Sequence, residues 1–140
     1  MVPLLGLNII LKSGLKYFLE IVVFISGATV MILEIVGCRV MAPYVGTSIF
    51  TWTSLIGIIL ASLSAGYYYG GRLADKSPNY NTLAKVILFS GVLIAVGALI
   101  RPYVFSAIEN LGDLRIRSFV AALLLFAPPS LVLGMISPYA

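Results

Sequence analysis

Long apolar runs alternate with short polar segments along the chain. A helix that crosses a membrane needs about 20 predominantly apolar residues, and somewhat longer runs cross at a tilt. The sequence lacks the alternating apolar and polar pattern of barrel strands, and an open sheet would leave unpaired edges in lipid. The pattern predicts one all-α domain over residues 1–140, a polytopic membrane protein with four transmembrane helices at about 17–40, 49–69, 82–104 and 118–136.

Turn-forming residues mark the boundary between the first two of these helices. Residues 42–48 include a proline and a glycine, so we expect them to end the first helix and begin the second. Thr47 or Ser48 is expected to be the N-cap of the second helix. Residues 2–11, ahead of the first long run, are expected to form a short interfacial or fraying segment.

Two further signals predict where the later helices end or break. Gly70-Gly71 is expected to end the second helix, with a polar turn at residues 75–79 after it. Pro128-Pro129 is expected to break the fourth helix, because proline removes a backbone donor and clashes with the preceding turn. A discontinuous helix can line a transporter site, and a static kink is an equally good interpretation.

The composition also indicates that lipid surrounds the chain. Hydrophobic residues make up 61% of it and charged residues 10%, with a mean hydropathy of +1.09. A soluble domain has about 45–50% apolar and about 25% charged residues, and a domain this small has too little interior to bury the excess. These values exclude an ordinary soluble enzyme, a disordered chain and a secreted disulfide scaffold.

Reactive side chains are few. The sequence has no histidine, and its single cysteine, Cys38, can form neither an internal disulfide nor a cysteine-based zinc site. The sequence also lacks a glycine-rich nucleotide fingerprint, a P-loop and a Ser-His-Asp set. We therefore expect no catalytic residue, no metal site and no cofactor.

Positive charge is distributed almost evenly over the two sides of the predicted bundle. Four spans put both termini on one side, with five basic residues there and four on the other. For a multi-pass cell-membrane protein the positive-inside rule then predicts cytoplasmic termini, because the side with the termini has one more basic residue than the other. So small a margin also permits dual insertion and an antiparallel homodimer. Because the basic residues flank apolar runs, the net charge of +4 indicates lipid headgroups, and not nucleic acid, as the partner.

Glu34 is the most informative single residue, because it is a carboxylate inside an apolar run. It lies roughly 9 Å from the predicted end of the first helix near Val40, at 1.5 Å per residue. At that depth a carboxylate is costly unless it is paired, protonated or next to water. Glu34 is therefore a candidate substrate- or proton-binding group, and the alternative is a carboxylate held by Arg39, Arg101 or a backbone group. Its predicted helix face also carries Gly27, Met31, Cys38 and Met41.

Small residues recur at a spacing of four in the second predicted helix. Ser62, Gly66 and Gly70 form a stripe that lets another helix backbone approach closely. Packing within one chain is the simpler interpretation of this stripe, and a dimer interface is the alternative.

A second group of charges follows the Gly-Gly pair. Arg72, Asp75 and Lys76 lie between the second and third predicted helices. Asp75 is expected to cap the third helix or to pair with a basic side chain of another helix. A charge relay that holds or releases one conformation is the functional interpretation, and a solvated loop is the simpler one.

Four motifs follow one another from about Phe24 to the end of the chain. Their joint order resembles the N-terminal membrane domain of membrane-bound spermidine synthase-like proteins, which fuse a major-facilitator-type domain with a spermidine synthase. The motifs are Ser26-Gly27 with Leu33-Glu34-Ile35-Val36-Gly37 and Arg39; Ala42-Pro43-Tyr44-Val45-Gly46-Thr47-Ser48 with Trp52-Thr53; Gly66-Tyr67-Tyr68-Tyr69-Gly70-Gly71-Arg72-Leu73-Ala74-Asp75; and Leu133-Gly134-Met135-Ile136-Ser137-Pro138-Tyr139-Ala140.

Residues 71–78 are similar to the major-facilitator loop between helices two and three. The glycine, leucine and aspartate of that pattern are present, and a lysine stands for its arginine. Pro78 replaces the second glycine, and Asn79-Tyr80 replace the basic pair. The resemblance implies a major-facilitator-like bundle with a conformational switch at Gly71, Arg72, Asp75 and Lys76.

The resemblance implies two functions of different kinds. One is a partial major-facilitator transporter that moves a small solute, a polyamine or another organic cation, and that needs a homodimer or a missing partner because a major-facilitator half has six helices. The other is a non-catalytic membrane anchor or assembly module for a spermidine synthase-like partner. The aminopropyltransferase domain of the family does not occur in this sequence, so we expect the chain itself not to be an enzyme.

Overall fold

Four long helices make up the computed structural model, which describes residues 2–76 and 79–139, with side chains for 12–76 and 79–138. They are α1 (Val2–Val45), α2 (Ile49–Lys76), α3 (Tyr80–Ile108) and α4 (Leu114–Tyr139), and no strand occurs in the described ranges. Each helix is long and apolar enough to cross a membrane. The prediction of an all-α chain with four long apolar helices is therefore confirmed.

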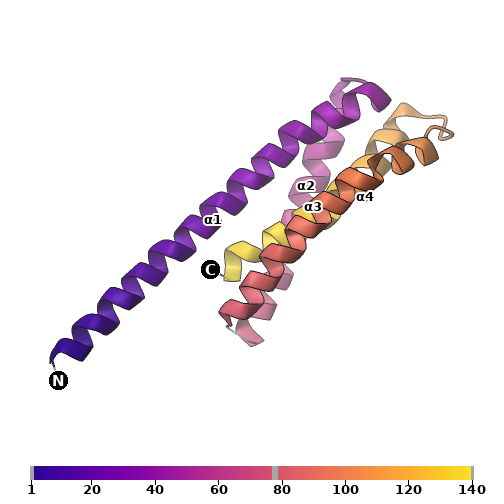
Figure 1. Ribbon diagram of the computed structural model, residues 1–140. Coiled ribbons are helices and arrows are strands. Elements are labelled where there is room, and N and C mark those ends of the chain that lie inside the picture. Colours follow the sequence, from indigo (N-terminus) through magenta and orange to yellow (C-terminus); the bar gives the residue numbers. More distant parts are fainter. Residues whose placement is uncertain (1, 77–78, 140) are drawn as a thin grey trace.

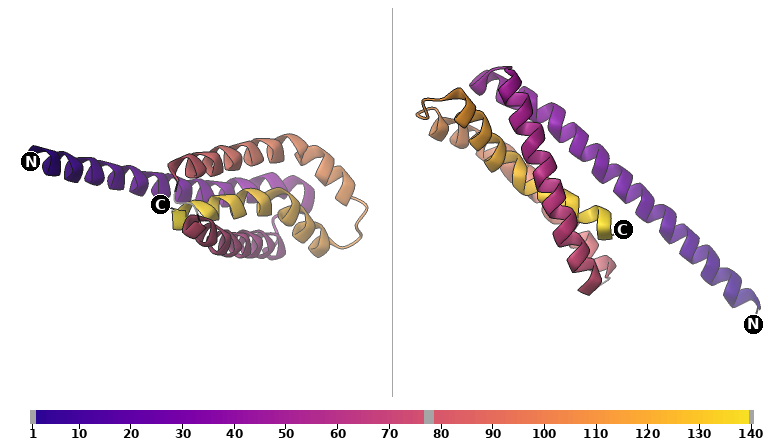
Figure 2. Two further views of the ribbon diagram at one scale, coloured as in Figure 1. Left: turned by 90° about the horizontal axis from the view of Figure 1, so that it is seen from below. Right: turned by 180° about the vertical axis from the view of Figure 1, so that it is seen from behind.

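The first helix is much longer than expected. Residues 2–11, expected as a separate interfacial segment, are the first turns of α1, which continues without interruption for 44 residues. Pro3 does not prevent this, because the first helical turn tolerates proline. At 1.5 Å per residue the helix is about 66 Å long, about twice the hydrocarbon thickness of a bilayer. Its N-terminal part extends past the other helices (Figures 1 and 2).

The turn between α1 and α2 has the predicted chemistry. The backbone N–H of Gly46 donates to the Ala42 carbonyl at 2.9 Å, and Gly46 has a φ of +81°, a conformation that glycine adopts without strain. The Ser48 hydroxyl accepts a bond from the Thr51 N–H at 3.4 Å. Ser48 is therefore the N-cap of α2, which confirms one of the two expected candidates.

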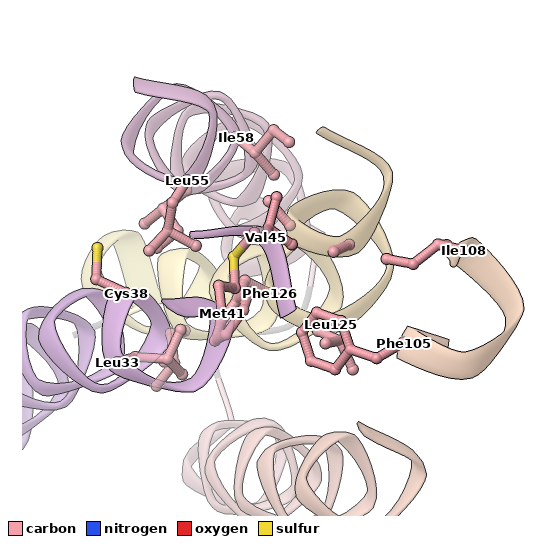
Figure 3. Close-up of a cluster of buried hydrophobic side chains, with 14 of the residues drawn as sticks. Leu33, Cys38, Met41, Val45, Leu55, Ile58, Phe105, Ile108, Leu125 and Phe126 are labelled. Atoms are coloured by element: carbon pink, nitrogen blue, oxygen red, sulfur yellow. The ribbon is translucent and has the colours of Figure 1, made fainter. Parts of the chain in front are cut away.

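Helix α4 occupies the middle of the bundle and packs against each of the other three helices. α2 and α3 lie on opposite sides of it, and α1 lies beside it (Figure 2). A buried apolar cluster fills the end of the bundle where α1 turns into α2 (Figure 3). Phe105, Met41, Leu55 and Val45 are among its most enclosed members, and the Tyr44 ring stacks on the Phe105 ring with 4.0 Å between centroids.

The closest helix contact is between α2 and α4. Ser62, Gly66 and Gly70 are buried in this contact face of α2. A Cβ atom on Gly66 would overlap the Leu131 carbonyl oxygen of α4, and one on Gly70 would lie 2.7 Å from the Met135 Cα. From the other side, a Cβ atom on Gly134 would lie 2.8 Å from the Leu63 carbonyl oxygen. The two backbones therefore touch, as they do where small residues form a helix interface in lipid.

The second helix does not end at Gly70-Gly71, so that prediction is wrong. α2 continues to Lys76, because Gly70 is used for close packing inside the helix and not as a stop. Asp75 and Lys76 of the expected polar turn are helical, Asn79 follows as the N-cap position of α3, and Ser77 and Pro78 lie outside the described residues.

The fourth helix is not broken at Pro128-Pro129, so that expectation is also wrong. α4 continues through both prolines and changes direction near them (Figure 2). Each proline removes one backbone donor, and therefore the Leu124 and Leu125 carbonyls have no helical N–H four residues later. Neighbouring turns and helices hold the rest of α4 in register, as in other membrane helices with proline.

Replacing Gly66 with alanine is expected to destabilise the bundle by about 1–3 kcal/mol, because the added methyl group would overlap backbone atoms that cannot rotate away. Gly57→Ala is the matched control: it lies in the same helix, and nothing is within 4 Å of the added Cβ. The control should be neutral or gain up to about 1 kcal/mol, because alanine favours helices over glycine. Unfolding in mixed micelles, monitored by circular dichroism, measures the stability of both variants. Equal stability of the two variants would contradict the close contact.

Candidate functional site

Glu34 lies deeper along the first helix than the sequence suggested. α1 continues past Val40 to Val45, so the carboxylate is about 16 Å from the helix end at 1.5 Å per residue. That distance is about half of a hydrocarbon core of roughly 30 Å. The expected 9 Å was too short because Pro43 lies inside the last turn of α1 and does not end it.

The Glu34 side chain faces an open groove of about 250 Å³ between α1, α2 and α4. Gly27 and Met31, expected on the same helix face as Glu34, also line it. The other two residues of that face, Cys38 and Met41, are buried in the apolar cluster instead. The expected face is therefore divided into a packed part near the end of α1 and a groove in the middle. The groove-lining residues are Val23, Ser26, Gly27, Val30, Met31 and Glu34 of α1, Leu60, Leu63 and Tyr67 of α2, and Leu133 and Ser137 of α4.

Three hydroxyl groups share this groove with the carboxylate. The Ser26 hydroxyl donates to the Val23 carbonyl at 2.8 Å, so its proton is already used. Tyr67 and Ser137 are exposed, and their hydroxyls have no hydrogen-bond partner among the described side chains and backbone. The groove therefore offers one carboxylate and hydroxyl oxygens that can accept from an ammonium group or a protonated solute.

The carboxylate of Glu34 has no bond to a protein group within the described ranges. Arg39 and Arg101, the cations considered as its partners, are both exposed, and neither forms an ion pair there. Glu34 itself is partly buried. A carboxylate at this depth normally has a partner, because lipid does not solvate its charge. The structure thus leaves the Glu34 carboxylate in the groove without a protein partner from the described chain.

The four residues of the expected switch loop are helical. Gly71, Arg72, Asp75 and Lys76 form the last turns of α2 and are not a loop after a glycine turn. The Arg72 guanidinium lies over the Tyr68 ring, 5.1 Å from its centroid. Asp75 is exposed, makes no ion pair in the described part of the chain and does not cap α3. These residues are therefore a charged helix end that begins one turn beyond Tyr67, the last α2 residue that lines the Glu34 groove.

Sequence reasoning identified Glu34 but missed the groove hydroxyls of Tyr67 and Ser137. Leu60, Leu63 and Tyr67 recur at helical spacing, which places them on one face of α2. That spacing groups the three residues on one face, but the sequence alone does not say which face of α2 lies toward α1. The answer depends on the rotation of α2, which the Gly66 contact with α4 fixes.

Other candidate chemistry is sparse. Among the described residues, no three His, Cys, Asp or Glu side chains gather closely enough to hold a metal ion.

No family model, no characterised protein and no solved structure was found to match the chain. The resemblance to membrane-bound spermidine synthase-like proteins therefore stays a hypothesis that rests on the motifs alone.

Glu34→Gln is expected to keep or raise the thermal stability of the purified protein. The amide retains the size of the side chain and removes a charge that has no partner, and a central charge in a membrane helix costs about 2.5–3.5 kcal/mol on insertion scales. Melting in detergent, compared with the exposed control Glu20→Gln, measures the effect. A clear fall in melting temperature for Glu34→Gln alone would show that the carboxylate holds the fold together.

Proposed function

We propose that the chain is a multi-pass protein of the cell membrane that moves a small organic cation across the bilayer, with Glu34 as its cation- or proton-binding group. The observation that carries this proposal is the Glu34 carboxylate, which has no partner in the described chain and lies about 16 Å from the C-terminal end of a helix long enough to span a membrane. Ionisable groups at such depth are costly and mark ion or proton pathways in membrane proteins.

The chemistry of the groove supports an organic cation as the solute. Its apolar lining fits hydrocarbon segments, while Glu34, Tyr67 and Ser137 supply oxygen atoms for an ammonium group. A polyamine combines these two features, and the motif resemblance favours the same class. The negative charge would also attract a proton in the absence of the solute, and exchange of the two would couple transport to a proton gradient.

A second copy of the chain, or additional helices, is part of the proposal. The Glu34 groove is open on one side, so one chain does not enclose a path through the bilayer. An antiparallel homodimer would close the groove, and the small difference in positive charge between the two sides permits it. The bundle would then act as part of a major-facilitator-like assembly, with cytoplasmic termini in one of its two orientations.

Liposomes that contain the purified protein should accumulate labelled spermidine, and a proton gradient should change the rate. Glu34→Gln is expected to reduce uptake at least tenfold, because the amide carries no charge to attract the cation. Glu20→Gln, also in α1 but outside the groove, should retain uptake.

Two results would contradict parts of this proposal separately. Equal uptake by the native protein and by Glu34→Gln would remove the role of Glu34. Uptake no greater than in empty liposomes would remove transport itself.

A different function, a membrane anchor for a soluble synthase-like partner, is favoured by the shape of α1. Its N-terminal part extends past the bundle at the end where α4 finishes (Figure 1), so it offers a helical arm for docking. Co-purification of such a partner without transport would support the anchor. Glu34 would then have a structural role, and its replacement would harm assembly.

A further inference from the structure

A second groove, distinct from the one that contains Glu34, separates α1 from α3. Both helices pack against α4 but hardly against each other, which leaves an open channel of about 200 Å³ with α4 as its floor. Leu33 and Val36 of α1 form one wall, Ile94 and Ala98 of α3 form the other, and Phe126 lies on the floor. None of the acidic residues lines it.

The groove is about as long as the hydrocarbon layer of one leaflet is thick. Along α1 it runs from Thr29 to Val40, about 16 Å at 1.5 Å per residue, which is half of a core of roughly 30 Å. The Thr29 hydroxyl donates to the Ile25 carbonyl at 2.8 Å. The hydrogen-bonding capacity of this hydroxyl is therefore satisfied within the helix, and apart from Arg101 the other residues that line the groove are apolar.

A single unpaired cation stands at the outer end of the groove. Arg101 lines it at the level of Val40, about 10 Å along the axis from the end of α3 at Ile108. It is exposed and has neither a hydrogen bond nor an ion pair within the described chain. Two other arginines of this end are engaged: Arg117 donates to the Leu111 and Glu109 carbonyls, and Arg115 lies 4.2 Å from the centroid of the Phe50 ring. Arg39 is also without a partner in the described chain, but it does not line the groove.

We propose that this groove binds one acyl chain of an anionic phospholipid whose phosphate contacts Arg101. The apolar channel takes a hydrocarbon chain of one leaflet, and the free guanidinium at its outer end matches the planar, bidentate geometry of a phosphate. A long arginine side chain at this depth reaches the headgroup level, where the phosphate lies. The inference rests on the proposed membrane location and is independent of transport.

The charge at the end of the groove favours a phospholipid over a helix from a second copy. A phospholipid brings an anionic phosphate to the guanidinium of Arg101 together with the hydrocarbon chain for the apolar channel. A single acyl chain is much thinner than a helix and can lie in the channel with α1 and α3 left in place.

Lipid retention by the purified protein tests this proposal. The native protein in detergent is mixed with phosphatidylglycerol or with phosphatidylcholine of the same acyl chains, and bound lipid is counted by native mass spectrometry. We expect retention of phosphatidylglycerol to exceed that of phosphatidylcholine. Arg101→Gln should reduce this preference about fivefold, the effect of one basic residue near an anionic lipid surface. Arg115→Gln should leave it unchanged.

Two tryptophan substitutions on α3, each at an alanine, test the channel itself. Ala98→Trp fills the groove and should remove retention of both lipids. Ala95 is also exposed but lies outside the groove, so Ala95→Trp should retain them. Melting temperatures show that both variants fold.

Two outcomes would overturn the proposal: equal retention of the two lipids by the native protein, or native-like retention by Ala98→Trp. If Ala98→Trp retained lipid and also changed its oligomeric state, a second copy would be the occupant of the groove. If the protein failed to take up spermidine but kept its lipid preference, transport would be contradicted and the lipid site would not.

Discussion

The close approach of α2 and α4 is the contact on which the remaining structure depends. In lipid, helices gain little from burying apolar surface against one another, so association depends on close packing and on polar contacts between helices. Gly66, Gly70 and Gly134 let the two backbones touch. Because α4 also packs against α1 and α3, the rotation set at this contact determines which faces are left open toward the other two helices.

Both candidate sites are consequences of that arrangement. α1 lies against α4 and α2 only in part, which leaves the groove with Glu34, Tyr67 and Ser137. α1 and α3 lie apart across α4, which leaves the apolar groove with Arg101 at its end. The two openings have opposite character: one offers a negative charge in the middle of the bundle, and the other offers a positive charge near its end.

The number and type of the helices could be predicted because each apolar run is long enough to span a membrane. Their ends could not, because the residues that suggested ends are used differently. Gly70 is a packing residue inside α2. Lys76, part of the expected polar turn, lies in the last helical turn of α2, where its long side chain can reach polar surroundings.

The site was only partly predictable for a similar reason. Glu34 could be recognised because an acid in an apolar run is rare and costly. Its neighbours in the groove come from α2 and α4, far away in the sequence, and their placement depends on helix rotation. A single sequence reports periodicity along each helix but not the angle at which that helix faces the others.

The proline pair in α4 has a mechanical consequence. Two backbone hydrogen bonds are missing at the middle of the helix, so α4 alone would bend most easily there. α2 spans this weak point and is attached to both halves: the Thr51 and Ser118 hydroxyls lie 3.3 Å apart on one side of it, and Gly66 packs against Gly134 on the other. Helix α2 therefore supports both halves of α4 across the proline pair. Because α1 and α3 pack less extensively against α4, they are the helices that can move most easily to open or close the two grooves.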